Sequence, residues 1–220
     1  MNTHARILNY LIFRHNYKTY LEIGLDNPAA TYVDIMAENK ESCDPYINVE
    51  ITPIISKYLT YHMKSDDMFA NMEPNKKYDL IFVDGLHDGK QVVRDVINAI
   101  KHINNNGLVV VHDCLPKKDY WTEPVFNKDN SKRHLGNGVF DGTWCGTTWT
   151  ALPVLKKIGV KFETLDVEYG LGVFRCQDVS NIEYNDDMFF DTKYEDVFSN
   201  ADTLKNTLNV IDEETFLNNY

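Results

Sequence analysis

The sequence predicts an α/β protein in which a doubly wound, mostly parallel sheet carries helices on both faces. Two observations predict this class. Strand and helix signals alternate through the first three quarters of the 220 residues, and residues 78–83 and 108–111 are nearly uninterrupted apolar runs. Such runs are typical of parallel strands buried on both faces, and alternation with helices is typical of a doubly wound sheet. Ligands of these sheets bind beyond the carboxyl ends of the strands, so the residues that follow strands are the functional candidates.

The elements are expected in the following order. Strands are predicted at 20–23, 42–44, 61–63, 78–83 and 108–111, with a closing pair at 161–167 and 170–175. Helices are predicted at 29–38, 51–58, 92–103 and 148–158. The helix at 92–103 is the clearest, because one face collects Val92, Val93, Val96, Ile97, Ile100 and Ile103. Residues 115–142 are irregular and polar, which is typical of a lid, a binding loop or a disordered segment.

Composition and charge exclude several classes of function. Lys and Arg total 22 against 33 Asp and Glu, a net charge of −11, so nucleic-acid partners are disfavoured. No apolar run approaches the roughly 18 residues of a membrane span, and Met1–Tyr10 has no apolar core of a signal peptide. The four cysteines form no C-x-x-C pair, which favours free thiols in a reducing compartment. We therefore expect a cytoplasmic protein without nucleic-acid or membrane partners.

The first three strand ends suggest a nucleotide-like ligand. Glu22 and Gly24 end the first strand, and Asp44 lies 22 residues after Glu22, near the spacing at which an acid binds ribose hydroxyls. Gly24 lets a ligand approach the backbone closely. Ser65 and Asp66 follow the third strand, where Asp66 could accept a hydrogen bond from an adenine amino group. The alternative interpretations are a turn with a cap and a helix N-cap, respectively.

The segment Asp84-Gly85-Leu86-His87 is the most informative in the chain. Asp84 ends a buried strand, where an unpaired carboxylate is costly. His87 can reach the same cleft and take a proton from a hydroxyl at neutral pH. Asp113 ends the next strong strand, and because parallel neighbours lie about 4.8 Å apart, Asp84 and Asp113 could share one Mg²⁺. The alternative is a helix cap, a surface histidine and a plain strand end.

Thiol chemistry and aromatic binding are weaker candidates. Cys114 and Cys145 carry no local signature of a nucleophile, and buried free cysteine is commonly inert packing. Trp121, Trp144 and Trp149 flank the long loop, where they could line a sugar- or ring-binding face or belong to the core.

Six segments together resemble the class I S-adenosylmethionine-dependent methyltransferases, and within them the branch of macrocin-type sugar O-methyltransferases. The resemblance covers about residues 19–175 and rests on the stretches 20–24, 43–45, 65–66, 82–87, 112–116 and 144–149. It implies a Rossmann-like methyltransferase fold with seven strands, the last of them antiparallel. We expect a methyltransferase domain over 1–177 and an extension of unknown role over 178–220 that packs on the same domain.

The resemblance further implies what each candidate residue does. S-Adenosylmethionine would lie against Glu22, Gly24 and Asp84, with its ribose on Asp44 and its adenine near Ser65 and Asp66. Asp84 and Asp113 would bind Mg²⁺, and His87 would be the general base that deprotonates a hydroxyl of a sugar or another small molecule. Two alternatives stay open: a catalytically inactive binding or scaffold protein on the same fold, and a nucleotide-dependent enzyme such as an oxidoreductase, whose G-x-G-x-x-G fingerprint is absent. The sequence also leaves open whether the chain forms a homo-oligomer.

Overall fold

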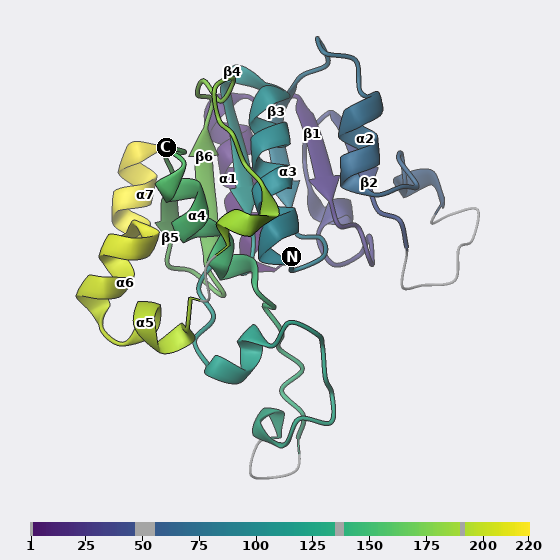
Figure 1. Cartoon of the computed structure of the whole chain (residues 1–220). Helices are drawn as coiled ribbons and strands as arrows, with labels where there is room; N and C mark the ends of the chain where they lie inside the picture. The colour runs from purple at the N-terminus through teal and green to yellow at the C-terminus, as the bar shows by residue number, and fades with distance from the viewer. Residues whose placement is uncertain (1, 47–55, 135–138, 190–191) are drawn as a thin grey trace.

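The computed structural model describes residues 2–46, 56–134, 139–189 and 192–220, whose strands form one seven-stranded sheet (Figure 1). The strands are β1 (Thr19–Ile23), β2 (Asn39–Cys43), β3 (Tyr78–Val83), β4 (Ile103–Val111), β5 (Glu163–Leu165), β6 (Leu171–Arg175) and β7 (Val210–Ile211). Their order across the sheet is β2-β1-β3-β4-β6-β5-β7. Strand β6 runs antiparallel to both of its neighbours, and every other pairing is parallel. The predicted fold class, mostly parallel with an antiparallel strand, is confirmed, but the antiparallel strand is β6 and not the last strand, because β7 follows it in the chain and runs parallel to β5.

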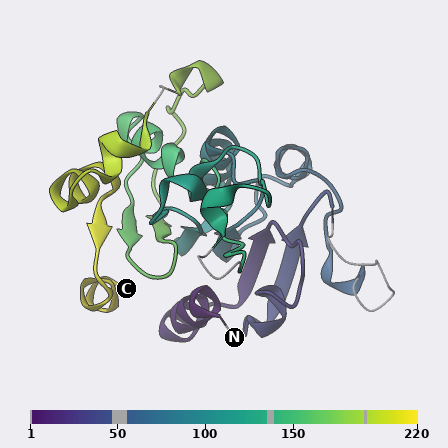
Figure 2. The ribbon, with the colours of Figure 1, turned by 90° about the horizontal axis from the view of Figure 1, so that it is seen from below.

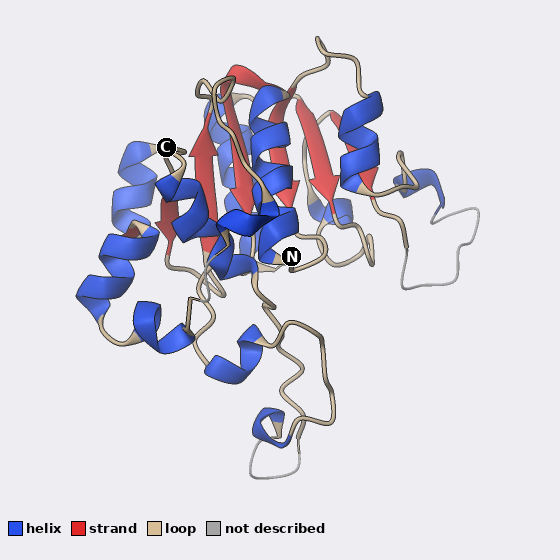
Figure 3. Ribbon diagram, viewed as in Figure 1, coloured by secondary structure: helices blue, strands red, loops and turns tan. Residues whose placement is uncertain are grey.

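Helices cover both faces of the sheet (Figures 2 and 3). They are α1 (Thr3–His15), α2 (Ser65–Asn71), α3 (Gly89–Lys101), α4 (Ala151–Lys157), α5 (Tyr194–Phe198), α6 (Ala201–Leu208) and α7 (Glu213–Asn219). The described residues also form the 3-10 turns η1 (Tyr32–Asp34), η2 (Ser56–Tyr58), η3 (Asp119–Thr122), η4 (Ser131–Arg133), η5 (Thr148–Thr150) and η6 (Asp186–Met188). Helices α2, α3 and α4 pack on one face, and α1 and α7 on the other. Among the described residues, no helix is both long enough and apolar enough to cross a membrane.

Strand β3 explains why two helical layers are needed. Ile81 and Val83 point into the cluster under α2, α3 and α4, whereas Leu80 and Phe82 point into the cluster under α1. All four side chains are at most 1% exposed. Because each such side chain contributes about 1.5–3 kcal/mol when fully buried, neither face of this strand can be left to solvent.

Two predicted elements in the first third of the chain are wrong. The expected helix at 29–38 is only the short turn η1, because side chains from elsewhere bind its backbone: Asn9 bonds to the carbonyl of Asp34 and the amide of Met36, and Lys40 donates to two carbonyls. The expected strand at 61–63 is a single bridge between Tyr61 and Cys43. The chain turns into α2 directly afterwards, which leaves no length for a ladder. In the expected helix at 51–58, residues 51–55 lie outside the described residues and 56–58 form η2.

The other boundaries differ less. Helix α3 ends at Lys101, and Ile103 begins β4 instead of closing the helical stripe, because the carbonyl of His102 already accepts the amide of Tyr78 in the sheet. The expected helix at 148–158 is present as η5 followed by α4, with Pro153 in the first turn of α4, where it needs no amide donor. The closing strand pair forms β5 and β6.

The described part of the tail (178–220) adds one strand to the sheet. Strand β7 pairs with β5, with the amides of Thr164 and Asp166 donating to carbonyls of the tail at 3.0 Å each. Leu208 and Phe216 are fully buried against the two opposite faces. The seventh strand of the sheet therefore comes from the tail and not from residues 61–63.

Candidate active site

The carboxyl ends of three parallel strands open onto one cavity. Ile23 pairs with Val83, and Val83 pairs with Val111, so the three strands end in register. The residues that follow them line a cavity of about 700 Å³, a volume typical of small-molecule and cofactor sites. Its lining comes from seven parts of the chain: Glu22 with Gly24–Asp26, Ala30–Thr31, Asp44, Asp84–Gly85 with His87, His112–Asp113, Asp141–Trp144, and Tyr169.

Asp84, His87 and Asp113, here called the cavity triad, meet at the wall of this cavity. The Nε2 atom of His87 lies 3.3 Å from Oδ1 of Asp84, and its Nδ1 atom lies 3.3 Å from Oδ2 of Asp113. Nδ1 also lies 3.2 Å from the carbonyl oxygen of Trp144, whose ring stacks on the imidazole at 4.8 Å. The imidazole is thus fixed between two carboxylates and an indole.

The backbone of the triad is held in an unusual conformation. His87 and Asp113 have φ angles of 54° and 60°, in the left-handed region that non-glycine residues seldom adopt. Gly146 packs against His87 so closely that a Cβ there would lie 2.3 Å from its carbonyl oxygen, and the amide of Thr147 donates to that same oxygen at 2.8 Å. Such conformations cost about 1–3 kcal/mol each and concentrate at functional sites.

The charges of the triad shift its proton affinities. Burial alone lowers the pKa of His87, but the hydrogen bond with Asp84 and the charge of Asp113 outweigh it and raise that pKa above 6.5. Burial also opposes ionisation of Asp84, yet His112 holds the pKa of Asp84 well below its ordinary value. Asp113 is the reverse case, since burial raises the pKa of its carboxyl. The site therefore holds a histidine with raised proton affinity beside a permanently ionised acid.

Glu22 is a second buried acid at the cavity. It is 2% exposed and accepts a hydrogen bond of 2.5 Å from the Tyr20 hydroxyl. Burial raises the pKa of Glu22 to about 8, with Asp84 adding to the effect. Glu22 is accordingly protonated at neutral pH, and a cationic ligand would favour its ionised form.

Gly24 and Asp44 shape another part of the cavity wall. Gly24 has a φ of 93°, and a Cβ there would lie 2.1 Å from the carbonyl oxygen of Asp84, so only glycine fits where the two strand ends touch. The carboxylate of Asp44 accepts the amides of Asp26 and Tyr46 at 2.9 and 2.7 Å while still lining the cavity.

Ser65 and Asp66 do not line this cavity. They form the first turn of α2, where Asp66 pairs with Arg94 at 3.2 Å and Ser65 bonds to Gln91. The structure thus brings together Glu22, Gly24, Asp44, Asp84, His87 and Asp113 but leaves these two residues apart from them.

The cysteines are poor nucleophiles. Cys114 and Cys145 are fully buried, and burial raises the pKa of both thiols, so they stay protonated. Trp144 lines the cavity, whereas Trp121 and Trp149 are buried in the protein interior.

Sequence reasoning missed several residues near the cavity. Asp141, Thr143 and Tyr169 line it from the long loop and from the turn between β5 and β6. Behind His112, the side chains of His4 and Glu168 form a second polar cluster. No motif signals these residues, because they come from segments that are far apart in the chain.

Comparison with known proteins matches part of the chain to a known domain. Residues 19–114 match a family model described as a methyltransferase domain. No curated protein matches the sequence significantly. Among solved structures, the chain is similar to the SAH-bound methyltransferase PaMTH1 of Podospora anserina, with 16% identity, a TM-score of 0.50, and coverage of 81% of this chain and 80% of that one. It is also similar to a putative O-methyltransferase of Klebsiella pneumoniae, with 13% identity, a TM-score of 0.48, and 80% of each chain covered.

These similarities agree with the architecture described above. The matched segment runs from β1 to the end of β4 and so contains every strand end at the cavity except the turn after β5. At 16% identity the similarity to PaMTH1 establishes the fold alone. Residues 19–114 therefore match a methyltransferase domain, and the chain shares the fold of a solved methyltransferase structure.

Proposed function

We propose that this protein is a methyltransferase that moves the methyl group of S-adenosylmethionine to a hydroxyl of a sugar or another small hydroxylated molecule, with His87 as the general base. The observation that carries the proposal is the imidazole of His87, fixed between Asp84 and Asp113 at the cavity wall. O-Methylation needs such a group, because a neutral hydroxyl must lose its proton as it attacks.

The contacts of His87 assign a role to each ring nitrogen. Nδ1 faces the carbonyl oxygen of Trp144, an acceptor only, so this nitrogen carries the proton that donates there. Nε2 is then the atom that takes the proton of the acceptor hydroxyl. Asp84, 3.3 Å from Nε2, stabilises the positive charge that the ring gains.

The donor set of the cavity fits S-adenosylmethionine. Glu22, Asp44 and Asp84 are acids, which suit a ligand that carries a sulfonium, an ammonium group and a ribose diol. We assign cofactor contacts to these three residues and to the backbone at Gly24. Bound S-adenosylmethionine supplies an electrophilic methyl group, so the protein need only orient the acceptor and remove its proton.

Asp84 and Asp113 also fit a divalent cation. Ligand atoms of the cavity triad all lie within 4.8 Å of one another, and carboxylate oxygens are the ligands that Mg²⁺ prefers. A bound Mg²⁺ would lower the pKa of a coordinated hydroxyl and fix its direction.

The acceptor side of the cavity combines aromatic faces with polar groups. Trp144 and Tyr169 supply flat apolar surfaces, and Asp141 and Thr143 lie beside them. Aromatic stacking next to hydrogen-bonding groups is suited to a sugar ring or to a hydroxylated aromatic compound.

Calorimetry with S-adenosylmethionine, with and without Mg²⁺, tests the proposal together with an assay of radiolabelled methyl transfer to a panel of sugars and phenols. We expect binding and transfer to at least one hydroxylated acceptor. Binding without transfer to any acceptor would favour the inactive scaffold, and absence of binding would reject the cofactor assignment.

A further inference from the structure

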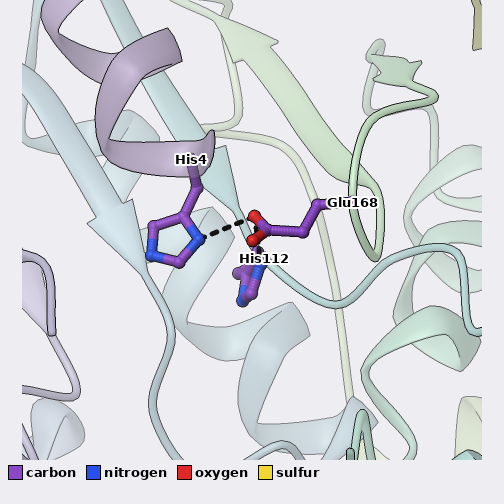
Figure 4. Close-up of side chains that lie close together, drawn as sticks. All are labelled: His4, His112 and Glu168. Atoms are coloured by element: carbon purple, nitrogen blue, oxygen red, sulfur yellow. Dashed lines mark hydrogen bonds and ion pairs between the residues drawn. The ribbon is translucent and has the colours of Figure 1, made fainter. Parts of the chain in front are cut away.

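We propose that His4, His112 and Glu168, here called the His4 cluster, bind a first-row transition metal ion of the Zn²⁺ type at a site separate from the cavity triad. The three side chains converge from the first turn of α1, the end of β4 and the turn between β5 and β6 (Figure 4). Two imidazoles and one carboxylate form a ligand set typical of zinc and of other borderline metals, and not of Mg²⁺.

The distances fit one ion. Nδ1 of His4 lies 2.9 Å and Nε2 of His112 lies 3.6 Å from Oε2 of Glu168, and the three ligand atoms all lie within 4.8 Å of one another. Ligands about 2.0–2.2 Å from a tetrahedral zinc are separated by about 3.3–3.6 Å. The observed spacings bracket this value, so small side-chain movements would complete the site.

His112 supplies the strongest evidence for a missing ligand. Its side chain is 8% exposed, and its Nε2 atom is buried without a hydrogen-bond partner in the described part of the chain. Nδ1 faces Oδ1 of Asp84 at 3.2 Å and donates to it, which leaves Nε2 directed at Glu168. A carboxylate that binds the far nitrogen of a histidine is the arrangement that orients histidine ligands in metal sites.

His4 also has a hydrogen-bond partner on the ring nitrogen that would face away from the metal. With Nδ1 on the metal, Nε2 donates to the Thr31 hydroxyl at 2.8 Å. The amide nitrogen of Asn2 lies 2.6 Å from that same Nε2, so the metal-free protein has a second arrangement in which Nε2 accepts from Asn2 and Nδ1 donates to Glu168. The experiment below separates these two states.

The charges at the cluster favour a cation. The neighbouring His112 is the largest influence that lowers the pKa of Glu168 to about 2, so the carboxylate of Glu168 is ionised. Burial lowers the pKa of His4, which keeps a lone pair available. Against the effect of burial, Asp84 raises the pKa of His112, so a metal would replace its Nε2 proton.

The site would act on the cavity from behind. His112 lines the cavity, whereas His4 and Glu168 do not. A bound ion would fix His112, and through it Asp84, without touching a substrate. His112 would then be a positioning residue, and the ion would join α1 to the sheet.

The experiment measures metal content in the untagged full chain. The protein is stripped with a chelator, equilibrated with Zn²⁺, freed of unbound metal and analysed by mass spectrometry, with affinity from competition with a chromogenic chelator. We expect one zinc per chain, with affinity reduced at least about 10- to 100-fold in His4→Ala and Glu168→Gln. His15→Ala is the matched control, because this histidine lies on the same helix but is exposed, and it should bind zinc like the wild type.

Two further measurements distinguish the His4 cluster from the cavity triad and report the coordination of the ion. Asp113→Asn should retain zinc, since Asp113 belongs to the cavity triad and approaches the His4 cluster only at Nδ1 of His112, 3.6 Å away, and not at a proposed ligand atom. Co²⁺ bound to the wild type should give the intense visible absorption of a four-coordinate ion, and His4→Ala should lose this absorption. Circular dichroism of the stripped proteins checks folding, and His4→Gln replaces any variant that fails to fold. Zinc retained at full affinity by His4→Ala and Glu168→Gln, or zinc absent from the wild type, would overturn the proposal. None of these readouts depends on methyl transfer.

Discussion

The cavity triad and the His4 cluster are built from the same kinds of side chain but are encoded differently. Two members of the triad are three residues apart, and the third ends the next strand, so regular strand ends bring them together. The His4 cluster joins residues up to 164 positions apart, from a helix, a strand and a turn. The triad faces the cavity, and the cluster lies behind it, with His112 contacting both. Short motifs thus reveal a site that one supersecondary unit forms, but not one that tertiary packing assembles.

The largest expected effect is a loss of turnover on substitution of His87, which belongs to the cavity triad and not to the His4 cluster. His87→Ala should reduce turnover by about 10²–10⁴-fold, because the acceptor hydroxyl loses its base, and should leave cofactor affinity nearly unchanged. Initial rates with an accepted substrate and calorimetry with S-adenosylmethionine measure the two quantities. Turnover at the wild-type rate would remove His87 as the base, and His15→Ala is the control for loss of an imidazole.

The next effect tests which acid holds the cofactor. Asp44→Ala should weaken S-adenosylmethionine binding by about 10- to 100-fold, since a hydrogen bond to a charged group contributes about 1.5–3 kcal/mol. Asp66→Ala should change it less than about threefold, because Asp66 pairs with Arg94 away from the cavity. The dissociation constants of S-adenosylmethionine for Asp44→Ala and Asp66→Ala, measured under the same conditions, test this ranking. The opposite ranking would place the adenine at α2.

A smaller effect concerns pH. Glu22 is protonated below its pKa of about 8, and the cationic cofactor favours the carboxylate, so binding must release a proton below that pH. Affinity should therefore rise by up to about tenfold per pH unit as pH increases towards 8, then level off. Calorimetry in buffers of different ionisation enthalpy measures the proton release. Glu22→Gln should abolish it, and a slope that persists in this variant would assign the linkage to the cavity triad.

The smallest effect tests whether the two sites are independent. His4→Ala should lower turnover by less than about tenfold with KM unchanged, because His4 reaches the triad only through His112 and Asp84. Metal-stripped wild type should show the same loss, and addition of zinc should restore the wild type but not the variant. A hundredfold loss in His4→Ala would mean that the clusters form one catalytic unit.

Much of the fold could be predicted from the sequence, because the strands at the centre of the sheet are nearly uninterrupted apolar runs, which indicate burial on both faces. The failures lie where tertiary contacts replace local ones. Residues 29–38 look helical, yet Asn9 and Lys40 satisfy their backbone groups from other segments. Strand β7 is two residues long and is defined only by its partner β5.

The candidate site shows the same division. The residues that follow strands, Gly24, Asp84 and Asp113, could be placed by topology, since parallel strands end at one edge. The position of Asp66 could not be predicted in this way, because the distance between Asp66 and the cavity depends on where α2 begins. Glu168 owes its position to a left-handed turn with a φ of 54°, which no pattern of apolar residues reports.

The pairing of the tail with β5 also bears on the solution behaviour of the protein. Without residues 178–220, the backbone of β5 would offer free amides and carbonyls along an open border, a template for the strands of other chains. Strand β7 occupies that border, is itself only two residues long, and is followed at once by a helix. The tail therefore covers the edge of the sheet at β5. We expect a shortened chain that ends after β6 to aggregate more readily than the full chain.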